Sequence, residues 1–75
     1  MGFFGGGASV AAVEYTVLSD FDSSNLYTGL AVKGTATSSA SWTIRKTTFN
    51  SDGAVTATGT KINGVWNNRL TETYT

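Results

Sequence analysis

The side chains of this 75-residue chain that could do chemistry are few. It has no His and no Cys, which excludes His-based triads, Cys nucleophiles and metal sites built on thiolate or imidazole. A nucleophile would need a Ser-Lys or Thr arrangement, and the eight Ser and three Lys show no S-x-x-K signature. We therefore expect no catalytic residue, no metal ligand and no cofactor, and we predict that the chain is not an enzyme.

One spacing resembles the start of a calcium loop. Asp20-x-Asp22-x-Ser24 places three oxygen ligands at alternate positions, as an EF-hand loop does. That loop also needs Gly at its sixth position and Glu at its twelfth, where this chain has Asn25 and Ala31. The pattern therefore predicts two solvated carboxylates in a turn.

Trp42 and Trp66 are the other residues that could form a binding site, as stacking platforms for sugars or bases. A nucleic-acid site would need a cationic groove beside them, but the five basic and five acidic residues cancel and are scattered singly. We expect no nucleic-acid partner, and core packing is the preferred interpretation of both indoles. A carbohydrate platform stays open as an alternative.

The size of the chain limits the core that it can build. A domain this small buries only about 60% of the surface of its unfolded chain, and without disulfides or a metal the remaining support is burial against other chains. The charged fraction is only 13%, which gives little protection against association. The longest apolar stretch, about Ala8 to Val13, is far shorter than the ~20 residues of a membrane helix, so we expect no membrane partner.

Period-two patterning in a Thr-rich, Leu-poor chain predicts an all-β fold. The clearest signal is a hairpin, in which Ser41–Phe49 and Ala54–Ile62 are strands and Asn50–Gly53 is the turn. Trp42 and Ile44 lie on one face of the first of these strands. The remaining segments are predicted as a strand over Val10–Leu18, a loop over Ser19–Asn25, a strand over Leu26–Lys33 with Gly29 as a bulge or point of close approach, a loop over Gly34–Ser41, a helical turn over Val65–Leu70 and a short strand over Thr71–Thr75.

These segments predict one small β domain over residues 10–75, which is an antiparallel sheet or an open barrel or sandwich of about five strands. Its structural core is expected to comprise Tyr15, Val17, Tyr27, Trp42, Ile44, Val55 and Trp66. Residues 1–9 are predicted to be a glycine-rich N-terminal arm. The aromatic rings and close-packing glycines of this arm are expected to dock on a partner, through Phe3, Phe4, Gly5, Gly6 and Gly7.

A set of spaced residues in the second half resembles a small module of tailed bacteriophages. The set is Tyr27-x-Gly29-x-Ala31, Gly34-Thr35-Ala36-Thr37-Ser38, Trp42-x-Ile44-Arg45-Lys46, Asp52-Gly53-x-Val55-Thr56, Trp66-x-x-Arg69 and Tyr74. The resemblance covers about Tyr27 to Tyr74, and the proteins concerned are usually described as virion structural proteins. It implies a non-catalytic assembly role without a cofactor. The Trp66-x-x-Arg69 spacing is expected to place Arg69 near an aromatic ring or a carboxylate as a structural clamp.

The resulting hypothesis is a multi-copy virion protein near the tail that attaches or braces fibres. Its partners would be other virion proteins, in tail, fibre or capsid, and copies of itself, and it would be assembled in the cytoplasm of the host bacterium. A capsid decoration or cement protein is the alternative in the same class. A carbohydrate-binding module for host recognition, using Trp42 or Trp66, is the alternative from a different class.

Overall fold

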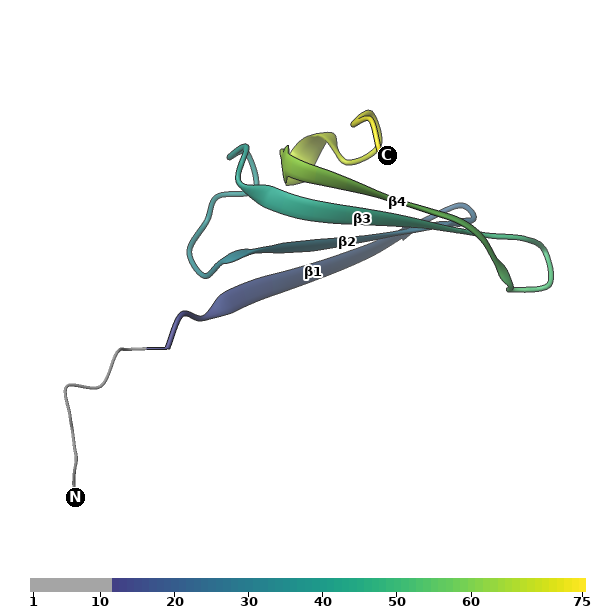
Figure 1. Ribbon diagram of the computed structural model, residues 1–75, viewed down its shortest axis with the longest axis horizontal. Helices are drawn as coiled ribbons and strands as arrows, with labels where there is room; N and C mark the ends of the chain where they lie inside the picture. The colour runs from purple at the N-terminus through teal and green to yellow at the C-terminus, as the bar shows by residue number, and fades with distance from the viewer. Residues whose placement is uncertain (1–11) are drawn as a thin grey trace, which may run out of the picture.

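The computed structural model describes residues 12–75 and contains one four-stranded antiparallel sheet (Figure 1). Its elements are β1 (Tyr15–Asp22), β2 (Asn25–Val32), β3 (Trp42–Phe49), β4 (Val55–Gly64) and a 3-10 helix, η1 (Trp66–Asn68). Each strand pairs with the next one in the sequence, in the order β1-β2-β3-β4. The prediction of an all-β fold with an antiparallel sheet is therefore confirmed. The predicted arm over residues 1–9 lies outside the described residues.

The structure has four strands where about five were expected. The difference lies in the C-terminal segment, which was predicted to end in a strand over Thr71–Thr75. Its only strand-like pairing is a bridge in which Thr60 and Thr75 exchange two backbone hydrogen bonds of 3.0 and 3.1 Å. The helical turn predicted before this segment is present as η1.

The first hairpin is tighter than the sequence suggested. Ser19–Asn25 was predicted as a loop, but only Ser23 and Ser24 connect β1 to β2, and Ser23 has the positive φ, 59°, that two-residue hairpin turns use. The prediction was wrong because the polar residues Asp20 and Asp22 made the end of an edge strand look like a turn. The second hairpin turn lies where it was predicted, and Asn50 holds it by accepting hydrogen bonds at Oδ1 from two later backbone amides.

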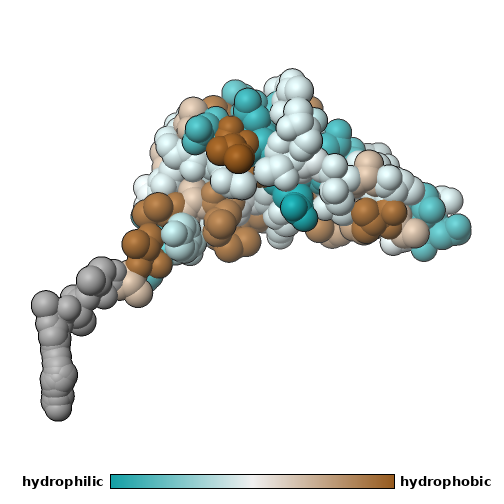
Figure 2. Space-filling model, viewed as in Figure 1, coloured by the Kyte–Doolittle hydropathy of each residue, from teal (hydrophilic) through white to brown (hydrophobic). Residues whose placement is uncertain are grey.

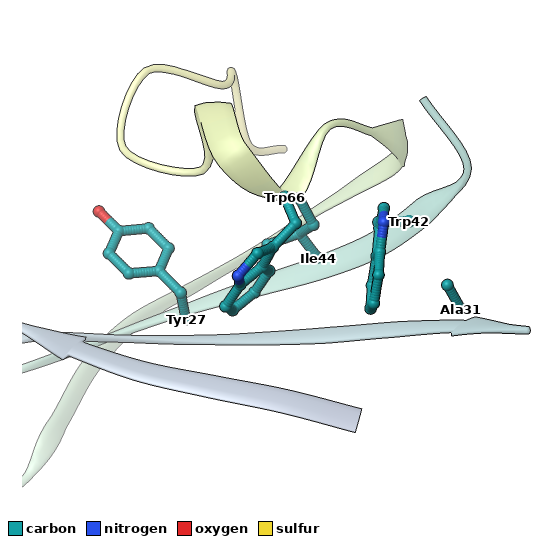
Figure 3. Close-up of a cluster of buried hydrophobic side chains, with 5 residues drawn as sticks. All are labelled: Tyr27, Ala31, Trp42, Ile44 and Trp66. Carbon is teal, nitrogen blue, oxygen red and sulfur yellow. The ribbon is translucent and has the colours of Figure 1, made fainter. Parts of the chain in front are cut away.

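One face of the sheet is covered by the C-terminal segment, which we call the cap (residues 65–75; Figure 1). Beneath it lies a cluster of five buried residues, Tyr27, Ala31, Trp42, Ile44 and Trp66 (Figure 3). Trp66 comes from η1, and its ring centroid lies 6.1 Å from that of Trp42. Leu18 and Tyr74 pack against this cluster. The core is thus a thin layer between a sheet and a short irregular segment.

Three residues that were predicted in the core are exposed instead: Tyr15, Val17 and Val55. In β1 the alternate residue Leu18 points toward the cap, so Tyr15 and Val17 lie on the other face of the sheet. Val55 lies at the turn end of β4, away from η1 (Figure 1). Period-two alternation shows that two faces differ, but it does not show which one is covered.

Gly29 is the point of close approach that the sequence predicted. A Cβ atom at this position would lie 2.6 Å from Cε3 of Trp66 and 3.2 Å from Cε3 of Trp42. Only glycine therefore lets the indole of Trp66 rest on the backbone of β2.

Substitution Gly29→Ala should displace the Trp66 ring and lower the free energy of unfolding by about 1–3 kcal/mol, the usual cost of overpacking. Urea unfolding followed by tryptophan fluorescence would measure the change. Thr43→Ala, at an exposed position of β3, is the matched control and should cost clearly less. Equal losses in the two variants would contradict the proposed contact.

Candidate functional site

The face of the sheet opposite the cap carries no other element among residues 12–75 (Figure 1). We call it the open face. The register and the alternation of side chains assign to it Tyr15, Val17, Ser19, Phe21, Leu26, Thr28, Leu30, Val32, Thr43, Arg45, Thr47, Phe49, Val55, Thr58, Thr60 and Ile62. Apolar groups gather along this side of the molecule in the space-filling view (Figure 2).

The open face divides into two halves of different chemistry. The residues contributed by β1 and β2 form the apolar half, which is defined as Tyr15, Val17, Ser19, Phe21, Leu26, Thr28, Leu30 and Val32. None of these eight residues is charged. Cross-strand partners in it are Tyr15 with Val32, Val17 with Leu30, and Phe21 with Leu26. The other half, on β3 and β4, is dominated by threonine and carries Arg45.

The apolar half is accessible to a partner. Val17 and Phe21 are each 68% exposed, and Leu30 is 43% exposed. At its turn end, Phe21 lies beside Phe49 of β3 with ring centroids 6.2 Å apart. These two rings line a shallow recess of about 410 Å³ together with Ser23, Ser24, Asn50 and Gly53.

On the opposite face, Arg69 fastens the cap to β1. Its Nε and Nη2 donate to Oδ2 of Asp20 at 3.1 and 3.0 Å, and its Nη1 donates to the backbone carbonyl of Trp66 at 3.1 Å. The guanidinium carbon also lies 4.7 Å from the centroid of the Trp66 ring. The expected clamp therefore exists with both an aromatic ring and a carboxylate. Asp20, which was interpreted as a solvated carboxylate in a turn, is instead the acceptor of this ion pair.

The end of the cap is held by two further side chains. Glu72 accepts a hydrogen bond from the backbone amide of Val65 at 2.7 Å, and the hydroxyl of Tyr74 donates to the backbone carbonyl of Arg69 at 2.7 Å. Burial, and to a lesser extent the neighbouring Tyr27 and Glu72, raise the pKa of Tyr74 to about 12. The neutral phenol is the form that can donate this bond.

Both tryptophans are used in packing. Trp42 is 1% exposed and Trp66 is 7% exposed, and Nε1 of Trp42 donates to the carbonyl of Ala36 at 2.9 Å. Neither indole offers a free ring face to a sugar. The suggestion that one of them is a carbohydrate platform is therefore wrong, and their interpretation as core residues holds.

The part of the chain that the structure describes contains no group of three or more His, Cys, Asp or Glu residues placed to hold a metal ion. Within that part, no helix has the length and apolar character needed to cross a membrane.

Of the residues predicted as sites, the structure brings Tyr27, Trp42, Ile44 and Trp66 together in the core. The docking residues predicted in the arm, Phe3, Phe4, Gly5, Gly6 and Gly7, lie outside the described residues. The open face was not predicted as a site. The sequence nevertheless contains a signal for it. In both β1 and β2, apolar residues lie on the face opposite the one that packs against the cap.

Comparisons of the chain with protein-family models, with curated proteins and with solved structures found no match. The candidate site is therefore defined by the geometry of this chain alone.

Substitution Arg69→Lys keeps the charge but removes the planar group that stacks on Trp66 and bonds Asp20 through two nitrogens. Because this pair is partly exposed, we expect a loss of about 1 kcal/mol in the free energy of unfolding. Urea denaturation would measure it, with Arg45→Lys on the open face as the control. The clamp has no role in stability if both variants unfold at the wild-type urea concentration.

The raised pKa of Tyr74 predicts a stability that depends on pH. The unfolded chain loses this proton near the usual tyrosine value of about 10, whereas the folded chain loses it near 12. Between these values the unfolded state binds fewer protons, so stability should be complete below pH 10 and fall as the pH rises toward 12. Melting temperatures over this range should fall less steeply for Tyr74→Phe than for the control Tyr15→Phe, and parallel profiles would refute the prediction.

Proposed function

We propose that this chain is a non-enzymatic structural protein of a bacteriophage virion. It is present in several copies and is associated with the tail, where it attaches or braces fibres. The resemblance of the segment Tyr27–Tyr74 to virion structural proteins supports this proposal. The observation that carries it is the exposed apolar half of the open face, because such a surface suits a protein that is buried among neighbours.

The balance between the core and the exposed surface favours assembly. Only five residues of the described chain form the buried cluster, whereas nine large apolar residues are exposed. Monomeric soluble proteins rarely expose contiguous apolar patches larger than a few hundred Å². A neighbour that covers the apolar half would add to the small core the burial that the chain lacks by itself.

The free edge of β1 offers a second contact for assembly. Among residues 12–75, β1 pairs only with β2, and it contains neither Pro nor Lys, the residues that often block pairing at an edge. The opposite edge of the sheet, on β4, is partly occupied by the bridge to Thr75. Docking of the arm through Phe3 and Phe4 remains a prediction and would add a third contact.

Two measurements on purified phage particles test the proposal. Quantitative mass spectrometry should find the chain in about a dozen copies or fewer, as expected for a closed ring in the tail. Hundreds of copies would favour a decoration protein of the capsid, and absence from the particles would contradict a virion role. Deletion of residues 1–7 should reduce incorporation, and Phe3→Ser with Phe4→Ser in an arm of unchanged length should do the same if the rings are the anchors.

A further inference from the structure

We propose that the apolar half of the open face binds the same surface of a second copy of this chain, face to face about a two-fold axis. This proposal rests on the proposed function in treating the open face as an assembly surface, and it names the partner. The caps of the two copies would lie on the outside of the pair, and the two sheets would form its centre.

The distribution of charge favours a second copy as the occupant. In a two-fold contact each patch meets its own equivalent, so a charged patch would meet a like charge. None of the eight residues of the apolar half is charged. Charged residues border it: Arg45 lies on β3, Asp22 follows Phe21 at the end of β1, and Lys33 and Glu14 pair with each other at 3.1 Å beyond the strand ends. The surface can therefore oppose itself without repulsion, and it offers no charged group to a charged ligand.

The area of the surface is also sufficient. Tyr15, Val17, Phe21 and Val32 are between 52% and 68% exposed. The eight residues of the apolar half together expose on the order of 600 Å² per copy, so that complete coverage would bury on the order of 1,200 Å² in a pair, at the lower end of the range for stable interfaces.

The shape of the sheet supports contact through faces. Two sheets pack with their strands about 30° apart and about 10 Å between them, and their inner side chains interdigitate. The small cross-strand pair Ser19 and Thr28 lies between two larger pairs, Val17 with Leu30 and Phe21 with Leu26, and so provides a gap between two ridges for this packing. The Thr-rich half of the open face, with Arg45, would stay at the rim of the contact in water.

A second copy could instead add to the free edge of β1, and the hydrogen-bond pattern separates the two arrangements. The amide of Lys33 donates to the carbonyl of Glu14 at 2.9 Å, so the even-numbered residues of β1 bond to β2. The amides of Tyr15, Val17, Ser19 and Phe21 therefore point toward the free edge. Pairing at the edge would protect these amides and leave the apolar faces in water, whereas contact through faces leaves the amides open and covers the apolar side chains.

The test is the mass of the full chain in solution by sedimentation across a range of concentrations. We expect a species of twice the 7.8 kDa of the chain. The double variant Val17→Thr with Leu30→Thr places a β-branched residue that favours strands at both positions but removes apolar surface. It should weaken the dimer at least tenfold. The matched control is Ile62→Thr, because Ile62 is 67% exposed and lies on β4 outside the apolar half. This variant should dimerise as the wild type does. Tryptophan fluorescence and the melting temperature would show that each variant is folded.

A wild-type chain that stays a folded monomer at all concentrations overturns the proposal, as does a dimer that the double variant leaves intact. Slow hydrogen exchange at the four outward amides of β1 overturns it as well, because it indicates pairing at the edge. Incorporation into particles separates this inference from the proposed function. If the wild-type chain is a monomer and the double variant fails to enter particles, the proposal of a second copy is refuted and the virion role is not. If the chain is a dimer but is absent from particles, the virion role is refuted and the dimer is not.

Discussion

The contact between the ring of Trp66 and the backbone of Gly29 is the constraint on which the rest of the structure depends. Gly29 lies in the middle of β2, and the absent side chain is what lets the ring approach within van der Waals distance of the strand. Arg69 then stacks on that ring and reaches across to Asp20 on β1, and Tyr74 bonds the backbone of Arg69. The cap is thus a chain of contacts that leads from the backbone of β2 through Trp66 and Arg69 to β1 and Tyr74.

The same constraint explains why the molecule has two unlike faces. Among residues 12–75, the cap is the one segment that covers a face of the sheet, and it lies on the face that carries Gly29. Hydrophobic residues on the other face of β1 and β2 remain exposed, although their spacing is the spacing of a half-buried strand. A sheet with one dry and one exposed apolar face suits a protein whose final burial comes from other chains, which is the physical basis of the assembly role proposed for it.

Much of this fold can be read from the residues, and the wrong predictions on β1 share one cause. The hairpin from Ser41 to Ile62 and the close approach at Gly29 follow from alternation and turn chemistry, which act locally. The exposed positions of Tyr15 and Val17 do not, because the side of β1 that becomes covered depends on the cap, whose Arg69 lies 49 residues away from Asp20 in the sequence. The polar end of β1 was likewise predicted as a loop. A local pattern could not show that Asp20 pairs with Arg69 in the cap.

The long separation between Asp20 and Arg69 also has a consequence for how the chain folds. The strands form a meander of neighbouring hairpins, and such local pairings close small loops and form quickly. The ion pair between Arg69 of the cap and Asp20 of β1 joins residues 49 positions apart, so it closes a longer loop than the contacts within a hairpin do. We expect this contact to form later than the hairpins, so that docking of the cap settles which surface of the sheet stays exposed. In a chain that folds in this order, docking of the cap is the step that makes the two surfaces of the sheet unlike.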